Sequence, residues 1–135
     1  MNRFQAHKFL LVDDSDIDSI ITSKILQLSG LDKGNVIVKH AQTGLDFLAA
    51  EATTITTTTK ADLIILLDIH MPEMTGFDFL AKFEQMTDAI TDNCKIFLLT
   101  SSIDPSDIDR ANQNRFVVRV LNKPLNTDEL LYYFE

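Results

Sequence analysis

The sequence predicts an α/β fold in which one parallel sheet is covered by helices on both faces. Five short apolar runs alternate with five segments of helical periodicity along the 135 residues. The central run, Leu63–Leu67, consists of large aliphatic residues only, which fits a strand buried on both faces. Because strand–helix–strand crossovers share one hand, such a series builds a parallel sheet. The length suits a single hydrophobic core, and we expect residues 1–135 to form one domain.

The apolar runs predict five strands. Their ranges are Lys8–Val12, Val36–Val38, Leu63–Leu67, Cys94–Thr100 and Phe116–Leu121. Alternation of strands and helices does not by itself fix the order of the strands in the sheet. By analogy with other doubly wound sheets, we expect a flavodoxin-like (βα)5 three-layer sandwich with strand order 2-1-3-4-5.

Capping residues and apolar periodicity predict five helices. They are one from Asp16 to Gly30, one capped by Thr43, one from Phe77 to about Met86, one capped by Asp104 with Pro105 as its first residue and ending near Gln113, and one capped by Thr127 that runs to about Phe134. The first of these helices carries Ile17, Ile20, Ile21, Ile25 and Leu28 at helical spacing, the pattern of an amphipathic helix.

Composition and charge disfavour several classes of partner. The net charge of -8 argues against nucleic acid, which needs clustered Lys and Arg. No apolar run approaches the roughly 20 residues that span a bilayer, and Met1–Val12 lacks the features of a signal peptide. The single cysteine, Cys94, cannot form an internal disulfide, so we expect a cytoplasmic protein. The threonine-rich segment Thr53–Thr59 lacks alternation and is predicted to be a solvated loop without function.

Polar residues follow four of the predicted strands. Asp13 and Asp14 follow the first strand, Asp68 the third and Lys123 the fifth, while Thr100 closes the fourth and precedes Ser101. Alone, each could be a helix cap, a strand end or a surface residue. Parallel strands place their carboxyl ends at one edge, however, so we expect these side chains to converge on one crevice.

Three gathered carboxylates repel one another, and one lysine does not compensate them. A divalent cation with oxygen ligands does, and Mg²⁺ suits a site that combines carboxylates, a backbone carbonyl, waters and a phosphate oxygen. Asp68 can attack phosphorus as a nucleophile and form an acyl phosphate. Thr100 can donate a hydrogen bond to a phosphoryl oxygen, and Lys123 can supply a positive charge to another.

Four segments in order resemble the receiver domain of two-component response regulators, the CheY-like family. They are Leu11-Val12-Asp13-Asp14, Leu67-Asp68-Ile69-His70-Met71-Pro72-Glu73-Met74-Thr75-Gly76, Leu98-Leu99-Thr100-Ser101 and Asn122-Lys123-Pro124-Leu125. The resemblance covers essentially the whole chain. It implies that Asp68 is the phosphoacceptor and that Asp13, Asp14, Asp68 and the backbone carbonyl of His70 hold Mg²⁺. It further implies that Thr100 and Lys123 sense the phosphoryl group and that the Lys123–Pro124 peptide bond is cis.

One position departs from the family pattern. Receivers usually carry an aromatic residue three positions before the lysine, where this chain has Val120. A β-branched aliphatic side chain cannot bridge core and surface as an aromatic ring does. We therefore expect phosphorylation to be intact, and the usual coupling between threonine and aromatic residue to be altered.

The resemblance implies a phosphorylation-controlled switch rather than an enzyme. The phosphodonor would be a histidine kinase or a histidine phosphotransfer protein. A downstream protein would bind the face formed by the predicted fourth helix, fifth strand and fifth helix. We expect a stand-alone receiver without a fused output domain, as a monomer or weak homodimer. Two alternatives are a Mg²⁺-dependent phosphohydrolase, although Asp68-Ile69-His70 lacks the second acid of an Asp-x-Asp motif, and a degenerate receiver that acts as a constitutive binding module.

Overall fold

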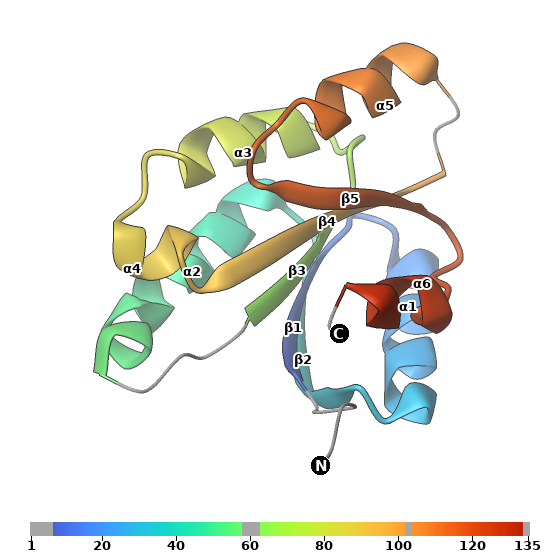
Figure 1. Cartoon of the computed structure of the whole chain (residues 1–135), viewed down its shortest axis with the longest axis horizontal. Coiled ribbons are helices and arrows are strands. Elements are labelled where there is room, and N and C mark those ends of the chain that lie inside the picture. The colour runs from blue at the N-terminus through green and yellow to red at the C-terminus, as the bar shows by residue number, and fades with distance from the viewer. Residues whose placement is uncertain (1–6, 58–62, 102–103, 134–135) are drawn as a thin grey trace.

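A five-stranded parallel sheet forms the centre of the computed structural model, which describes residues 7–57, 63–101 and 104–133 (Figure 1). Its strands are β1 (His7–Val12), β2 (Asp32–Val38), β3 (Leu63–Leu67), β4 (Cys94–Thr100) and β5 (Val117–Asn122). They are ordered β2-β1-β3-β4-β5, and every neighbouring pair is parallel. The predicted flavodoxin-like fold is confirmed, although β2 starts four residues earlier than its apolar run.

The helices lie in two layers, one on each face of the sheet (Figure 1). They are α1 (Asp16–Ser29), α2 (Ala41–Thr57), α3 (Gly76–Phe83), α4 (Asp88–Thr91), α5 (Pro105–Asn112) and α6 (Thr127–Tyr132). One layer contains α1 and α6, and the other contains α2, α3, α4 and α5. The short helix α4 was not predicted.

Strand β3 explains why the sheet is covered on both faces. All of its residues are buried, and alternate side chains enter opposite cores. Leu63, Ile65 and Leu67 pack in the core on the α2–α3 side, whereas Ile64 and Leu66 pack in the core under α1 and α6. Burying an aliphatic side chain of this size stabilises the fold by about 1.5–3 kcal/mol. The apolar run therefore requires helices on both faces.

Several helix ends follow their predicted capping chemistry. Asp104 caps α5, with Pro105 in the first turn, and its carboxylate accepts a hydrogen bond from the Ser106 N–H. Gly30 ends α1 in the left-handed conformation, with φ of 77°, which glycine adopts without a Cβ penalty. The predicted cap of α6 is wrong by one residue, because the side chain of Asn126 rather than Thr127 accepts the hydrogen bond from the Asp128 N–H.

Helix α2 is longer than the sequence predicts. It begins at Ala41, so Thr43 lies inside the helix and is not its cap, and it continues to Thr57. The prediction of a loop at Thr53–Thr59 is therefore wrong for residues 53–57, and residues 58–59 lie outside the described part of the chain. Extending an existing helix avoids the cost of nucleation, so weak helix formers can be added at its end.

Helix α1 turns most of its apolar stripe away from the sheet. Ile17, Ile20 and Leu28 are 71%, 65% and 81% exposed. The buried positions of the helix are Ser19, Thr22, Ser23 and Leu26. The amphipathic pattern therefore predicts the helix but not its orientation. This orientation of α1 places Asp18 beside Lys123 and Ser23 beside Asn35. The side chains of each pair form a hydrogen bond.

Candidate metal and phosphoacceptor site

The strand ends align so that the predicted residues meet at one edge of the sheet. The register pairs Val12 with Leu67, Leu67 with Leu98, and Thr100 with Asn122. The backbone ladder continues one residue further, because the Asp68 N–H donates to the Val12 carbonyl at 2.9 Å and the Lys123 N–H to the Thr100 carbonyl at 2.9 Å. The sheet itself therefore fixes the backbone under the site.

Asp13, Asp14 and Asp68 form a cluster of carboxylates at this edge. One carboxylate oxygen from each lies within 4.8 Å of the others. Asp13 and Asp68 are buried, at 7% and 9% exposure, and Asp14 is exposed. An all-oxygen donor set with several negative charges, partly open to solvent, fits a hard divalent cation such as Mg²⁺.

Lys123 links the two buried acids to a third from α1. Its Nζ lies 2.7 Å from Asp13 Oδ2, 2.9 Å from Asp18 Oδ2 and 3.5 Å from Asp68 Oδ2. Burial alone lowers the pKa of Lys123, but its hydrogen bonds to Asp13 and Asp18 and the charge of Asp68 outweigh that effect and raise the pKa above its ordinary value. The lysine is therefore a fixed positive charge inside the cluster.

The pKa of the Asp68 carboxyl group is higher than that of an ordinary aspartate. Burial raises its pKa from 3.8 to about 6, the charge of Lys123 opposes this shift, and the neighbouring Asp13 adds to it. The backbone N–H of His70 donates a hydrogen bond to the carboxylate and lowers the pKa slightly. A strand-end carboxylate with a raised pKa beside a specific cation is typical of functional sites.

Asp18 is a site residue that the sequence did not identify as one. It stands in the first turn of α1, where an acid suits the helix dipole, and Ser15 caps the same turn by accepting a hydrogen bond from the Asp18 N–H. Its partner Lys123 is 105 residues away in the sequence. The only local signal was the cap at Ser15, which sets the direction of the first turn.

The other predicted residues lie around the same edge. Thr100 is 1% exposed, and Ser101 lines a groove of about 380 Å³ with Lys123, Pro124 and Ile21. The predicted cis peptide bond between Lys123 and Pro124 is confirmed.

The side chain of His70 has a partner that the sequence did not suggest. His70 Nε2 lies 3.0 Å from Asp107 Oδ2 on α5. The backbone after Asp68 also packs closely against Gly76. A Cβ at position 76 would come within 2.6 Å of the Asp68 carbonyl oxygen, so only glycine fits there. The segment after the acceptor therefore contacts α5 through the His70 side chain and the start of α3 through its backbone.

Val120 is partly buried and packs against the core on the α2–α3 side. Together with Ile108, Asn112, Arg119 and Asn122 it lines a groove of about 210 Å³ between α5 and β5. A short aliphatic side chain thus leaves open space at the position where receivers usually carry a ring.

Comparison with known proteins agrees with this architecture. The sequence model of the protein family described as "Response regulator receiver domain" matches residues 9–135 of this chain. A response regulator receiver protein from Dyadobacter fermentans is 29% identical, with a TM-score of 0.76, and the alignment covers 95% of this chain and 94% of the other. A two-component response regulator from Cytophaga hutchinsonii is 26% identical, with a TM-score of 0.81 and 96% of each chain covered.

Two further matches concern a metal-bound receiver and a kinase. The Mn²⁺-bound form of response regulator Rcp1 is 25% identical, with a TM-score of 0.69 and coverage of 95% of this chain and 88% of that one. The sensor histidine kinase AruS of Pseudomonas aeruginosa is 39% identical over 67 residues, which are 50% of this chain and 7% of the kinase. The chain thus spans a small part of that relative's length.

Within the described residues, no helix combines the length and the apolarity required to cross a bilayer. Receiver domains act as signalling switches in two-component systems rather than as classical enzymes, and they interact with histidine kinases. With a match over residues 9–135, strands in the order β2-β1-β3-β4-β5 and the acids gathered at their carboxyl ends, this chain belongs to the response regulator receiver domain family.

Proposed function

We propose that the protein is a Mg²⁺-dependent phosphoryl acceptor that switches its protein contacts when Asp68 is phosphorylated. The observation that carries this proposal is the meeting of three carboxylates and one lysine at the carboxyl ends of β1, β3 and β5. Asp13, Asp14 and Asp68 come within 4.8 Å of one another, and Lys123 Nζ lies 2.7 Å from Asp13 and 3.5 Å from Asp68.

Asp13, Asp14, Asp68 and the backbone carbonyl of His70 would hold the metal ion. When bound, Mg²⁺ supplies positive charge that screens the carboxylates and the phosphoryl oxygens from one another. The donor set is rich in oxygen and negative charge, as hard cations require. The solved Mn²⁺-bound form of Rcp1, a relative at 25% identity, supports a divalent ion in this chain.

Asp68 would act as the nucleophile. One carboxylate oxygen forms a bond to phosphorus while the bond between phosphorus and the donor's imidazole nitrogen breaks, and that nitrogen keeps the electron pair. Lys123, already 3.5 Å from Asp68, would contact one phosphoryl oxygen, and the Thr100 hydroxyl would donate a hydrogen bond to another.

The phosphodonor would be a histidine kinase or a histidine phosphotransfer protein that covers the mouth of the site. The mouth includes the groove of about 380 Å³ formed by Lys123, Pro124, Ser101 and Ile21. On α1, whose Ile21 lines this groove, Ile17 and Ile20 are 71% and 65% exposed, which suits an apolar protein partner. We also propose that the protein is cytoplasmic, since its single cysteine, Cys94, cannot form an internal disulfide and suits a reducing compartment.

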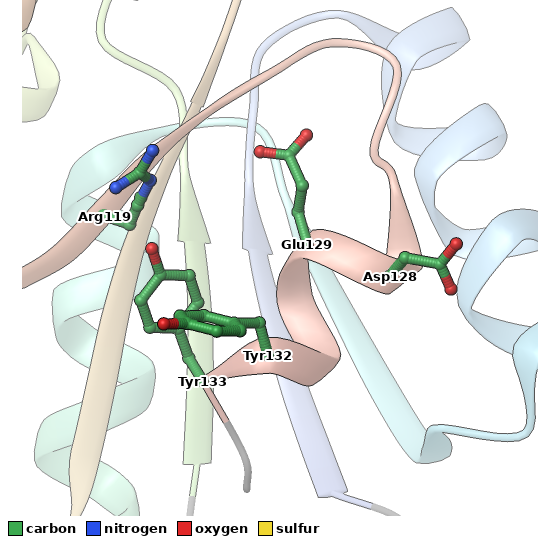
Figure 2. Close-up of a pocket in the computed structure, with 5 residues that line it drawn as sticks. All are labelled: Arg119, Asp128, Glu129, Tyr132 and Tyr133. Carbon is green, nitrogen blue, oxygen red and sulfur yellow. The ribbon is translucent and has the colours of Figure 1, made fainter.

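The output would be a protein contact on the face of α5, β5 and α6. Besides the groove at Val120, this face has a groove of about 490 Å³ lined by Arg119, Asp128, Glu129, Tyr132 and Tyr133 (Figure 2). Tyr132 is 74% exposed, and exposed tyrosines are common anchors in protein interfaces. We propose that phosphorylation alters this face, and that the protein is a monomer or a weak homodimer.

Incubation with Mg²⁺ and a small-molecule phosphodonor tests the proposal. The wild-type protein should show a slower band in a phosphate-affinity gel, and the slower band should be lost on addition of a chelator before the donor. Asp68→Asn should show no such band. If Asp68→Asn is modified as the wild type is, the assignment of the acceptor is wrong.

A further inference from the structure

Helix α1 presents hydroxyl groups to the sheet where apolar side chains are expected. Ser19, Thr22 and Ser23 are 4%, 5% and 8% exposed. The Ser23 hydroxyl donates to Asn35 Oδ1 at 3.2 Å. Ser19 Oγ, in contrast, has no hydrogen-bond partner within the described part of the chain. Buried side-chain oxygens are rarely left without a partner, so this hydroxyl indicates a bound group.

Ser19 lines a narrow cavity directly beneath the acidic site. The polar residues around the cavity are Ser19, Thr22, Asp13 and Asp68, and the remaining wall is aliphatic. Its volume is about 10 Å³, which is close to the space that one water molecule requires and too small for a larger ligand. A single buried water needs two to four polar partners, and these side chains supply them.

We propose that this cavity binds one water molecule, which connects Ser19 Oγ to the carboxylates of Asp13 and Asp68 and makes Ser19 a positioning residue of the metal site. The inference rests on the proposed Mg²⁺-dependent function. The two carboxylates can accept this water, because an ionised carboxylate has about four acceptor positions. Asp13 uses one for the Ser15 N–H and one for Lys123, and Asp68 uses others for Lys123 and the His70 N–H.

The water restricts rotation of the two carboxylates. Hydrogen bonds to metal-ligating carboxylates orient them, and removal of such outer partners commonly weakens metal binding tenfold or more. Ser19 contributes from α1, an element that supplies none of the three clustered carboxylates.

A crystal structure at atomic resolution tests the water directly. We expect a solvent peak within hydrogen-bond distance of Ser19 Oγ and of one oxygen of Asp13 or Asp68. A structure without this peak, or one in which Ser19 Oγ bonds the Ser15 carbonyl of its own helix, overturns the inference.

Mg²⁺ titrations followed by NMR chemical shifts test the role of Ser19. Ser19→Val fills the cavity with carbon and expels the water, so its affinity for Mg²⁺ should fall about tenfold, while its thermal midpoint stays equal or rises. Opposite changes in binding and stability are not expected from a residue with a merely structural role. Ser19→Ala keeps the space but removes one partner of the water, and we expect a smaller loss of affinity.

Ser23→Ala is the matched control. It removes a buried hydroxyl from the same helix face, but that hydroxyl bonds Asn35, so Mg²⁺ affinity should not change. If Ser19→Val and Ser19→Ala both bind Mg²⁺ as the wild type does, the positioning role is wrong. Such a result leaves the proposed function intact if the wild type is phosphorylated, whereas a wild type that accepts no phosphoryl group refutes the proposed function itself.

Discussion

At the scale of single residues, Lys123 allows acids to be buried beside one another. Its ammonium group contacts Asp13, Asp18 and Asp68, and its side chain is 11% exposed. Two of these contacts could be expected from the sequence, because strand ends in a parallel sheet meet. The third could not, because it depends on the direction in which the first turn of α1 leaves Ser15.

Removal of this lysine should be costly in the absence of metal. Lys123→Met leaves Asp13 and Asp68 without their cation, and breaking such a buried pair costs about 3 kcal/mol. Urea unfolding with a chelator present measures the loss, and added Mg²⁺ should restore part of it. Lys39→Met removes an exposed partner of Asp16, and the cost should stay below about 1 kcal/mol. Equal losses in the two variants would contradict the account.

The pKa of Asp68 predicts how stability depends on pH. Its pKa is 3.8 in the unfolded chain and about 6 when folded. Between these values the folded protein binds more protons than the unfolded chain, so this residue lowers the free energy of unfolding as pH rises from 4 to 6.

Asp68→Asn should therefore stabilise the metal-free protein at pH 7.5 by about 2 kcal/mol and should have little effect near pH 4. Urea unfolding at both values, with a chelator present, measures the difference. Asp14→Asn removes a charge from the same cluster but from an exposed position, so its effect should be smaller. A stabilisation by Asp68→Asn that is independent of pH would show that burial does not control this carboxyl group.

At the scale of elements, strands were predicted better than helices. The ranges of β3 and β4 are those that the apolar runs predict. Both strands are largely buried, so their sequences consist mainly of apolar residues that mark where each strand begins and ends. Helix α5 follows from Asp104 and Pro105, a local signal. The end of α2 depends on extension of a helix that has already formed. The orientation of α1 depends on contacts with distant residues, which its own periodicity does not report.

Two leucines near the end of α1 test that orientation. Leu26 is fully buried and Leu28 is 81% exposed. Leu26→Ala should lower the free energy of unfolding by about 2–5 kcal/mol, as is usual for a cavity in a core. Leu28→Ala should change it by less than about 0.5 kcal/mol. The reverse order in urea unfolding would mean that the apolar stripe, and not the hydroxyl face, packs on the sheet.

At the scale of the whole molecule, the sheet connects the site with the proposed output face. Thr100 ends β4, which pairs with β5, and His70 after the acceptor contacts Asp107 on α5. Val120 of β5 has no aromatic ring to respond to Thr100, so we propose that these two connections carry the change on phosphorylation. The parallel sheet made the positions of the site residues predictable, whereas the contact between His70 and Asp107 had no signal in the sequence.

We propose that strand ends far apart in the sequence together make Asp68 a Mg²⁺-dependent phosphoacceptor. To identify the acceptor, the protein is phosphorylated with a small phosphodonor, the acyl phosphate is reduced with borohydride, and the modified residue is located by peptide mass spectrometry. We expect reduction at Asp68 alone, and only when Mg²⁺ was present. Reduction at another residue, or at Asp68 to the same extent without divalent metal, would show that Asp68 is not a Mg²⁺-dependent acceptor.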